Sequence, residues 1–390
     1  MTFDLIPGFT STGSKRPESL FGSANDPSLP ARMTRTDGCR MWDTNGREYV
    51  DCIMALGAVA LGYAHPDVNR AAAAAMDAGV VGSLAPELEA ELAADIQRAM
   101  PWIEGIRFLK TGAEACAAAV RLARVATGRE HVLGCGYHGW LDWCAPGEGV
   151  PKGTRALFAE LPFNDVERTR ALIRGAGHRL ACVMIEPVIE ALPQREWLDM
   201  IRSETERTGA LLVVDEVKAV CRLAIGGGTE RYRLRPDLVV LGKALANGFP
   251  LAAVGGRADI MASASRTWIS STLATELVSL AAARATLAVM QQLRVPEILA
   301  RQGSRLHAGL ASLARLHEPL VAAVRGVPEM CHLAFRNEAD GFAVAAGCAR
   351  RGVLFKRSAY NFVSLAHDEQ AIDQVIAVVG EALAAVSGER

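Results

Sequence analysis

The chain has 390 residues and a formal net charge of −1, and half of its residues are apolar. Disordered chains have fewer apolar residues and more net charge, so this composition predicts a folded protein with a large core. Lys and Arg are not in excess over Asp and Glu. This balance argues against nucleic acid or an anionic membrane as a partner.

Targeting and redox features of the sequence favour the cytoplasm. The N-terminal stretch lacks the apolar region of a signal peptide, and no run of eighteen uninterrupted apolar residues predicts a membrane span. The nine Cys form no CxxC pair, and several lie in apolar runs. We therefore interpret them as buried thiols in a reducing compartment and expect a cytoplasmic protein.

The N-terminal part of the chain predicts little regular structure at first. Its first forty residues are polar and rich in Gly, Pro and Ser, which is typical of an extended arm. A β-hairpin is expected over 40–52, because the Asn45-Gly46 pair is a strong signal for a hairpin turn. Helical patterns follow at 66–78 and 86–100.

The middle of the chain alternates between short apolar runs and helical segments. Strands are predicted at 106–109, 132–135, 180–185, 210–214 and 238–241. Such uninterrupted apolar strands between helices indicate a mostly parallel sheet that is buried on both faces. Runs of this length are also compatible with buried segments of helix.

The C-terminal part predicts long helices and a smaller α+β unit. One amphipathic helix is expected from 278 to 316, and a final helix near 369–386. Short strands lie between them, and the N-terminal arm and hairpin could join this unit.

The first strand end that could carry chemistry is the turn before a helix expected over 113–126. Thr111 and Gly112 connect the strand at 106–109 to that helix. The free N–H groups and the dipole at a helix start favour an anion such as phosphate. An ordinary turn in which Thr111 caps the helix is the alternative.

Two further strand ends carry groups of opposite charge. Asp215 ends an apolar strand, at the edge where open α/β sheets bind ligands, and it needs a donor or a cation as its partner. Lys243 follows the next strand and Gly242, where partial desolvation would favour a nucleophilic amine. One crossover connects the two strands, so both side chains can face one crevice. A salt bridge or helix cap for Asp215 and a surface position for Lys243 are the alternatives.

Aromatic and acidic residues follow two other strands. Tyr137 and His138 lie between glycines and could stack on a flat ring, or pack over the sheet edge. Glu186 follows the strand at 180–185 and could support a ligand or form an ion pair. No His lies at metal-ligand spacing from Asp, Glu or Cys, so we predict no metal. Motifs of serine hydrolases, P-loop ATPases and nicotinamide-binding proteins are absent.

Taken together, these segments resemble the class III aminotransferases of fold type I, which use pyridoxal 5′-phosphate (PLP). The glutamate-1-semialdehyde 2,1-aminomutase-like branch is the most similar. The resemblance covers most of the chain and includes MWDTNGREYVDC, FLKTGAEACAAAVRLAR, GYHGW, VMIEPV, LLVVDEV and VVLGKALANGFPLAAVGG. It implies an α/β fold with a mostly parallel central sheet flanked by helices. The implied domains are 55–285 for the cofactor, and a small α+β domain built from 1–54 and 286–390.

The resemblance also implies a role for each strand-end residue. Lys243 would bind the cofactor as a Schiff base and move the substrate proton, and Asp215 would keep the ring nitrogen protonated. Gly112 and Ala113 would donate backbone N–H groups to the phosphate, and Tyr137 would stack on the ring. The other implied cofactor contacts are Glu186, His138 and, across a homodimer with shared active sites, Thr272.

The sequence departs from the family pattern at several positions. Ala113 replaces a Ser or Thr, so one hydroxyl donor to the phosphate is missing. Glu190 and Ala191 occupy the stretch where the aminomutases have an Asn, and the stretch 356–361 replaces their C-terminal acidic residue. Lys218 replaces a Gln or Met. Its charge could alter substrate preference, or it could point to solvent, and we expect the solvent-facing arrangement.

We expect a PLP-dependent transfer of an amino group between a small-molecule donor and a carbonyl acceptor. An aminomutase, a racemase or a decarboxylase would start from the same Lys243 and ring, so the motifs do not separate these reactions. A non-catalytic scaffold is a further alternative, and the intact Lys243 and Asp215 argue against it. Arg16 could clamp a substrate carboxylate or be a solvated charge of the arm.

Overall fold

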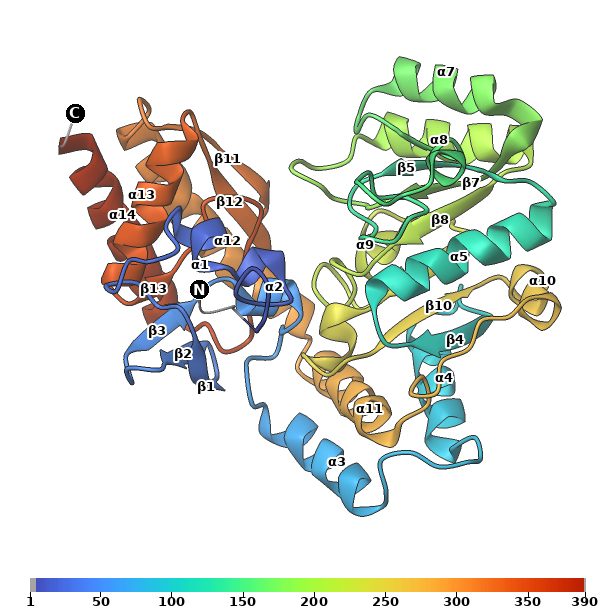
Figure 1. Ribbon diagram of the computed structural model, residues 1–390, viewed down its shortest axis with the longest axis horizontal. Coiled ribbons are helices and arrows are strands. Elements are labelled where there is room, and N and C mark those ends of the chain that lie inside the picture. The colour runs from blue at the N-terminus through green and yellow to red at the C-terminus, as the bar shows by residue number, and fades with distance from the viewer. Residues whose placement is uncertain (1–4, 389–390) are drawn as a thin grey trace. The chain divides into compact units, whose positions relative to one another are not determined.

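The computed structural model describes residues 5–388, which form two compact units (Figure 1). One unit combines Met1–His65 with Glu297–Arg390, and the other is Pro66–Pro296. We call them the small unit and the large unit. The sequence-based boundaries were 54/55 and 285/286, about one element away from these divisions.

The large unit is built on a seven-stranded sheet of order β4-β10-β9-β8-β7-β5-β6. All five predicted strands are confirmed to within one residue at each end, and β6 and β10 are additional. Neighbours from β9 through β6 are parallel, whereas β10 is antiparallel to both β9 and β4. The bounds are β4 (Gly105–Leu109), β5 (His131–Cys135), β6 (Phe158–Glu160), β7 (Leu180–Ile185), β8 (Leu211–Asp215), β9 (Leu238–Leu241) and β10 (Ala252–Gly256).

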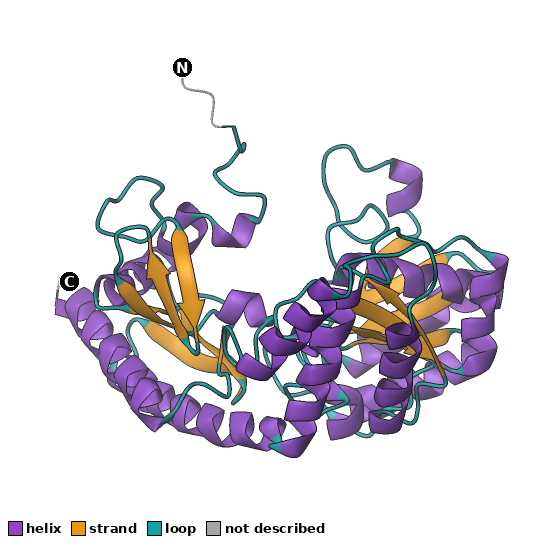
Figure 2. Ribbon diagram, turned by 90° about the horizontal axis from the view of Figure 1, so that it is seen from below, coloured by secondary structure: helices purple, strands orange, loops and turns teal. Residues whose placement is uncertain are grey.

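Helices cover this sheet because its central strands are apolar along their whole length. Every residue of β7 is buried. Helix α5 (Gly112–Thr127) packs on five of the strands, and its Ala-rich face allows a close approach. Helix α8 (Arg195–Thr208) packs on β7 and β8, and α7 (Val166–Ala176) packs on α8. Figure 2 shows helices around the strands of this unit.

The helix expected over 278–316 is two helices, so this prediction is wrong. Helix α11 (Leu277–Gln292) packs on α3 (Pro66–Asp77) and α4 (Glu87–Ala99), and α12 (Val295–Leu316) starts anew. Pro296 has no N–H to continue the helix and disfavours helical geometry at the residue before it. Arg294 adopts a φ of 51°, which ends the first helix.

In the small unit, one sheet joins the two chain ends in the order β1-β2-β3-β13. The predicted hairpin is confirmed as β2 (Arg40–Asp43) and β3 (Glu48–Asp51), and β13 (Val353–Leu354) pairs with β3 in parallel. The irregular arm was predicted too long. Helix α1 (Pro17–Phe21) and strand β1 (Met33–Asp37), which pairs with β2, form within the first forty residues.

A second sheet and three long helices, the first of them α12, also belong to the small unit. Strands β11 (Val321–Val327), β12 (Met330–Phe335) and β14 (Asn361–Phe362) form an antiparallel sheet. Helix α13 (Glu338–Arg350) packs on α14 (Glu369–Gly388), which is the final helix that the sequence predicted. Helix α14 has the length and apolar character of a membrane span. It also buries a stripe of apolar side chains within this unit, as a core helix does: Ala371, Ile372, Val375, Val378, Val379, Ala382 and Leu383.

Gly303 is a packing constraint on α12 that can be tested. A Cβ at Gly303 would lie 2.2 Å from the carbonyl oxygen of Pro328, so Gly303→Ala must displace backbone. We expect this overpacking to cost about 1–3 kcal/mol of unfolding free energy. Gly175, inside α7, has no heavy atom within 4 Å of its Cβ position. The matched control Gly175→Ala should therefore be neutral or raise the melting temperature. Equal melting temperatures for the two variants would contradict the packing argument.

Candidate active site

The sheet brings together the ends of three parallel strands, β7, β8 and β9. Ile185 pairs with Val214, and Asp215 pairs with Val240. Glu186 therefore follows β7 beside Asp215, and Lys243 lies two residues beyond the end of β9. The parallel register thus places two carboxylates and an amine at one edge of the sheet.

Asp215 is buried and accepts three hydrogen bonds. Its Oδ2 lies 2.8 Å from Nδ1 of His138 and 3.3 Å from Sγ of Cys116, and its Oδ1 accepts the N–H of Val217 at 3.1 Å. Burial alone would raise the pKa of Asp215, but the contact with His138 and the other donors hold it below its ordinary value. The carboxylate is therefore ionised at neutral pH.

His138 supports Asp215 instead of offering a free ring face. Its ring is buried and stacks on Trp143, with centroids 6.2 Å apart and planes at 21°. Cys116, one turn into α5, contacts the same carboxylate and was not singled out from the sequence. Three groups here lie within 4.8 Å of one another, as the ligands of one metal ion would: the sulfur of Cys116, a ring nitrogen of His138 and a carboxylate oxygen of Asp215. Sequence spacing could not reveal this cluster, because its members lie on three separate elements.

Lys243 begins a short 3-10 helix, Lys243–Ala246, in a left-handed conformation with φ 46°. Burial lowers the pKa of its amine. Within residues 5–388, no hydrogen-bond acceptor or ion-pair partner contacts its Nζ. A buried, unpaired amine is suited to act as a nucleophile.

Glu186 and Lys218 form an ion pair beside Lys243, and both side chains are largely buried. The expectation that Lys218 points to solvent is therefore wrong. It lies three residues beyond Asp215, in the turn after β8, and that turn directs it toward the end of β7. The other oxygen of Glu186 accepts the backbone N–H of Tyr137 at 2.7 Å.

The start of α5 has the features of an anion site. Thr111 and Glu114 form a reciprocal capping box, which uses the Thr111 hydroxyl. The N–H groups of Gly112 and Ala113 have no acceptor among the described residues. A Cβ at Gly112 would lie 3.0 Å from Val217, which shows how closely the turn after β8 approaches the helix start.

The remaining predicted residues of the large unit lie at its surface. The side chain of Tyr137 is 73% exposed, and its backbone is fixed by Glu186. Thr272 is exposed in the loop that precedes α11. The loop also exposes Trp268 and Leu273.

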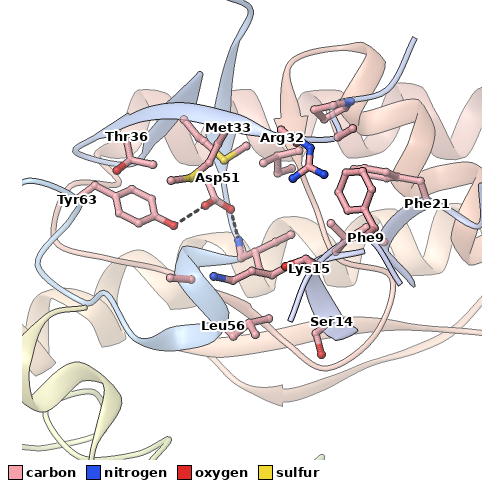
Figure 3. Close-up of a pocket in the computed structure, with 18 residues that line it drawn as sticks. Phe9, Ser14, Lys15, Phe21, Arg32, Met33, Thr36, Asp51, Leu56 and Tyr63 are labelled. Atoms are coloured by element: carbon pink, nitrogen blue, oxygen red, sulfur yellow. Dashed lines mark hydrogen bonds between the residues drawn. The ribbon is translucent and has the colours of Figure 1, made fainter. Parts of the chain in front are cut away.

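The small unit contains a pocket of about 440 Å³ (Figure 3). Lys15 and Arg32 line it, whereas Arg16 lies against Gly8. Asp51 forms part of its wall and accepts the hydroxyl of Tyr63 at 2.7 Å.

The wall of this pocket includes an unusual stretch of backbone. Met54, Ala55 and Leu56 have φ values of 46°, 50° and 60°, and the last two line the pocket. Left-handed geometry at consecutive non-glycine residues costs free energy and is concentrated at functional sites. The sequence gives no signal for it, because none of the three residues is Gly, Asn or Asp.

Comparison with known proteins identifies the family. The class III aminotransferase family matches residues 21–383. The chain belongs to this family. It is 34% identical over 417 aligned residues to the glutamate-1-semialdehyde 2,1-aminomutase of Methanothermobacter thermautotrophicus, with 97% of this chain and 96% of the relative covered.

Solved structures of the family share its fold. A PLP-containing form of the FumI protein from Sphingopyxis sp. MTA144 has a TM-score of 0.92 and 28% identity, with 99% of this chain and 94% of that chain covered. The β-phenylalanine aminotransferase of Variovorax paradoxus has a TM-score of 0.81 and 28% identity, with 96% and 93% covered. This class III aminotransferase is therefore a fold-type I enzyme, and its cofactor is PLP.

The residues at the strand ends fit that cofactor. An ionised carboxylate has about four lone-pair sites, and Asp215 uses three, so one remains for a protonated ring nitrogen. The two unpaired N–H groups at the start of α5 suit the phosphate of PLP. The unpaired amine of Lys243 suits its aldehyde.

Lys243→Ala should abolish covalent attachment of PLP, because no other unpaired buried amine lies at this strand edge in the described chain. Borohydride reduction followed by intact-mass analysis measures the attachment. Lys152, exposed in the short helix Lys152–Arg155, provides the control, and Lys152→Ala should retain the added mass. Retention of the added mass in Lys243→Ala would show that another residue binds the cofactor.

Proposed function

We propose that this enzyme transfers an amino group between a small-molecule amino donor and a carbonyl acceptor. The observation that carries this proposal is the unpaired, buried amine of Lys243 beside the ionised carboxylate of Asp215. Bound PLP supplies an electron sink that stabilises negative charge at the substrate carbon. Lys243 would hold the cofactor and then carry the proton to and from that carbon. Asp215, oriented by His138, would keep the ring nitrogen protonated.

Two departures from the aminomutase pattern favour transfer between two molecules. Glu190 and Ala191, in the stretch of the family's Asn, are both exposed, and neither has the amide side chain of Asn. The stretch that replaces the acidic residue is cationic. Lys356 donates to the carbonyl of Ala359 at 2.6 Å, and Arg357 pairs with Glu338 at 2.8 Å. The 34% identity to an aminomutase keeps the intramolecular reaction as the second candidate.

An isotope-labelled amino donor separates the two candidates. Incubation with a panel of labelled amines and a keto acid should give labelled amino acid, because transfer moves nitrogen from one molecule to another. Lys243→Ala is the blank. An isomerised amino aldehyde product that forms without any acceptor, together with no labelled amino acid, would favour the aminomutase.

We propose that the chain forms a homodimer, in which Thr272 reaches the phosphate in the partner's site, and that it is cytoplasmic. Exposed apolar side chains support the dimer. Trp268 and Leu273 are 81% and 51% exposed in one loop, and exposed apolar patches mark contact sites. The free cysteines support the reducing compartment.

Trp268→Asp should shift the chain toward monomer and weaken PLP retention, because the loop that carries Thr272 would lose its contact. Light scattering after size exclusion measures the mass, and the visible absorption of bound PLP measures retention. Leu316→Asp, at an exposed residue of α12, is the control. A monomeric wild-type protein with full PLP retention would overturn the dimer proposal.

A further inference from the structure

Lys218 is a second lysine at the cofactor edge, and the mechanism above gives it no role. Its side chain is 13% exposed and that of Glu186 is 7% exposed, so the ion pair is largely removed from water. Burying two charges costs free energy that their attraction does not always recover. A buried pair at a reactive edge therefore suggests a contribution to the chemistry.

The ion pair occupies one of the two carboxylate oxygens of Glu186. One oxygen of Glu186 accepts the N–H of Tyr137, and the other contacts the ammonium of Lys218. Both oxygens of Asp215 also accept hydrogen bonds, and its one remaining lone-pair site is the one assigned above to the ring nitrogen of PLP. Both carboxylates near Lys243 are thus engaged by other groups, and Lys243 is left without an ion-pair partner.

Four charged groups influence the pKa of Lys243, and they come from the end of β7, the end of β8 and the segment after β8: Glu186, Asp215, Lys218 and Arg222. His138 contacts the second of them. The two cations and burial favour the neutral amine, whereas the two carboxylates favour the ammonium. Without Lys218, one oxygen of Glu186 would be free to pair with Lys243.

We propose that Lys218 is a positioning residue that occupies Glu186 and thereby keeps the amine of Lys243 unpaired and ready to react at neutral pH. On PLP binding, Lys243 would give its ammonium proton to water, and its lone pair would form the C–N bond to the aldehyde carbon. The carbonyl oxygen would leave as water with the two remaining amine protons. This inference rests on Lys243 as the cofactor lysine, which the Lys243→Ala experiment tests separately.

The test is the pH dependence of PLP capture by cofactor-free, full-length protein. Stopped-flow absorbance gives the capture rate, and its midpoint reports the pH at which Lys243 loses its proton. In Lys218→Met the freed carboxylate should hold the ammonium, so the midpoint rises by about one unit and capture at neutral pH slows about tenfold. Lys218→Arg keeps the cation and should keep the wild-type midpoint.

The double variant Lys218→Met/Glu186→Gln is the decisive control. It removes both charges, so no free carboxylate is left to pair with Lys243, and the midpoint should return to within a few tenths of the wild-type value. Glu186→Gln alone should leave the midpoint at or below wild type. A purely structural role for Lys218 would lower the capture rate at every pH without moving the midpoint.

Two results would overturn the proposal. One is an unchanged midpoint in Lys218→Met, and the other is a double variant shifted as far as Lys218→Met. Where Lys218→Met does not give folded protein by circular dichroism, Lys218→Ala provides the neutral variant and the same comparison applies. Failure of Lys243→Ala to abolish PLP attachment would instead contradict the assignment of the cofactor lysine.

Discussion

The parallel register of β7, β8 and β9 is the constraint on which the site depends. Parallel neighbours end at the same edge, so the residues that follow each strand meet without any long-range loop. Ile185 beside Val214 and Asp215 beside Val240 fix Glu186 and Asp215 next to each other. A slip of one residue would turn Asp215 to the other face of the sheet and break its contact with His138. The register of these apolar strands therefore positions the charged groups of the site, and the same strands form the core.

At this edge, hydrogen bonds divide the charges into occupied and available groups. Asp215 is held by His138, Cys116 and a backbone N–H, and it remains ionised although it is buried. Glu186 is held by Tyr137 and Lys218. Of these three groups, Lys243 alone has no partner within the described part of the chain. In a buried site, which group can react therefore depends on which groups already have a hydrogen-bond or ion-pair partner.

The sequence predicts the scaffold well because its signals are local. The strands at 180–185 and 238–241 are continuous apolar runs, and their bounds agree with β7 and β9. The single helix over 278–316 was wrong because a Pro at the second position of a helix is as compatible with a new start as with a kink. The predicted orientation of Lys218 was also wrong. Its burial depends on Glu186, which follows another strand, and the residues around Lys218 in the sequence do not reveal that pairing.

The same dependence on distant partners applies to phosphate binding at α5. Ala113 lacks the hydroxyl that the family offers, and Thr111 does not replace it, because the capping box already uses its hydroxyl. Lys110 is also engaged, by Glu276 at 2.7 Å. Within its own chain, the phosphate would therefore depend on backbone N–H groups and the helix dipole, and both require the first turn of α5 to be fixed. In this chain the capping box would therefore preserve the phosphate site by fixing that first turn, without contacting the phosphate.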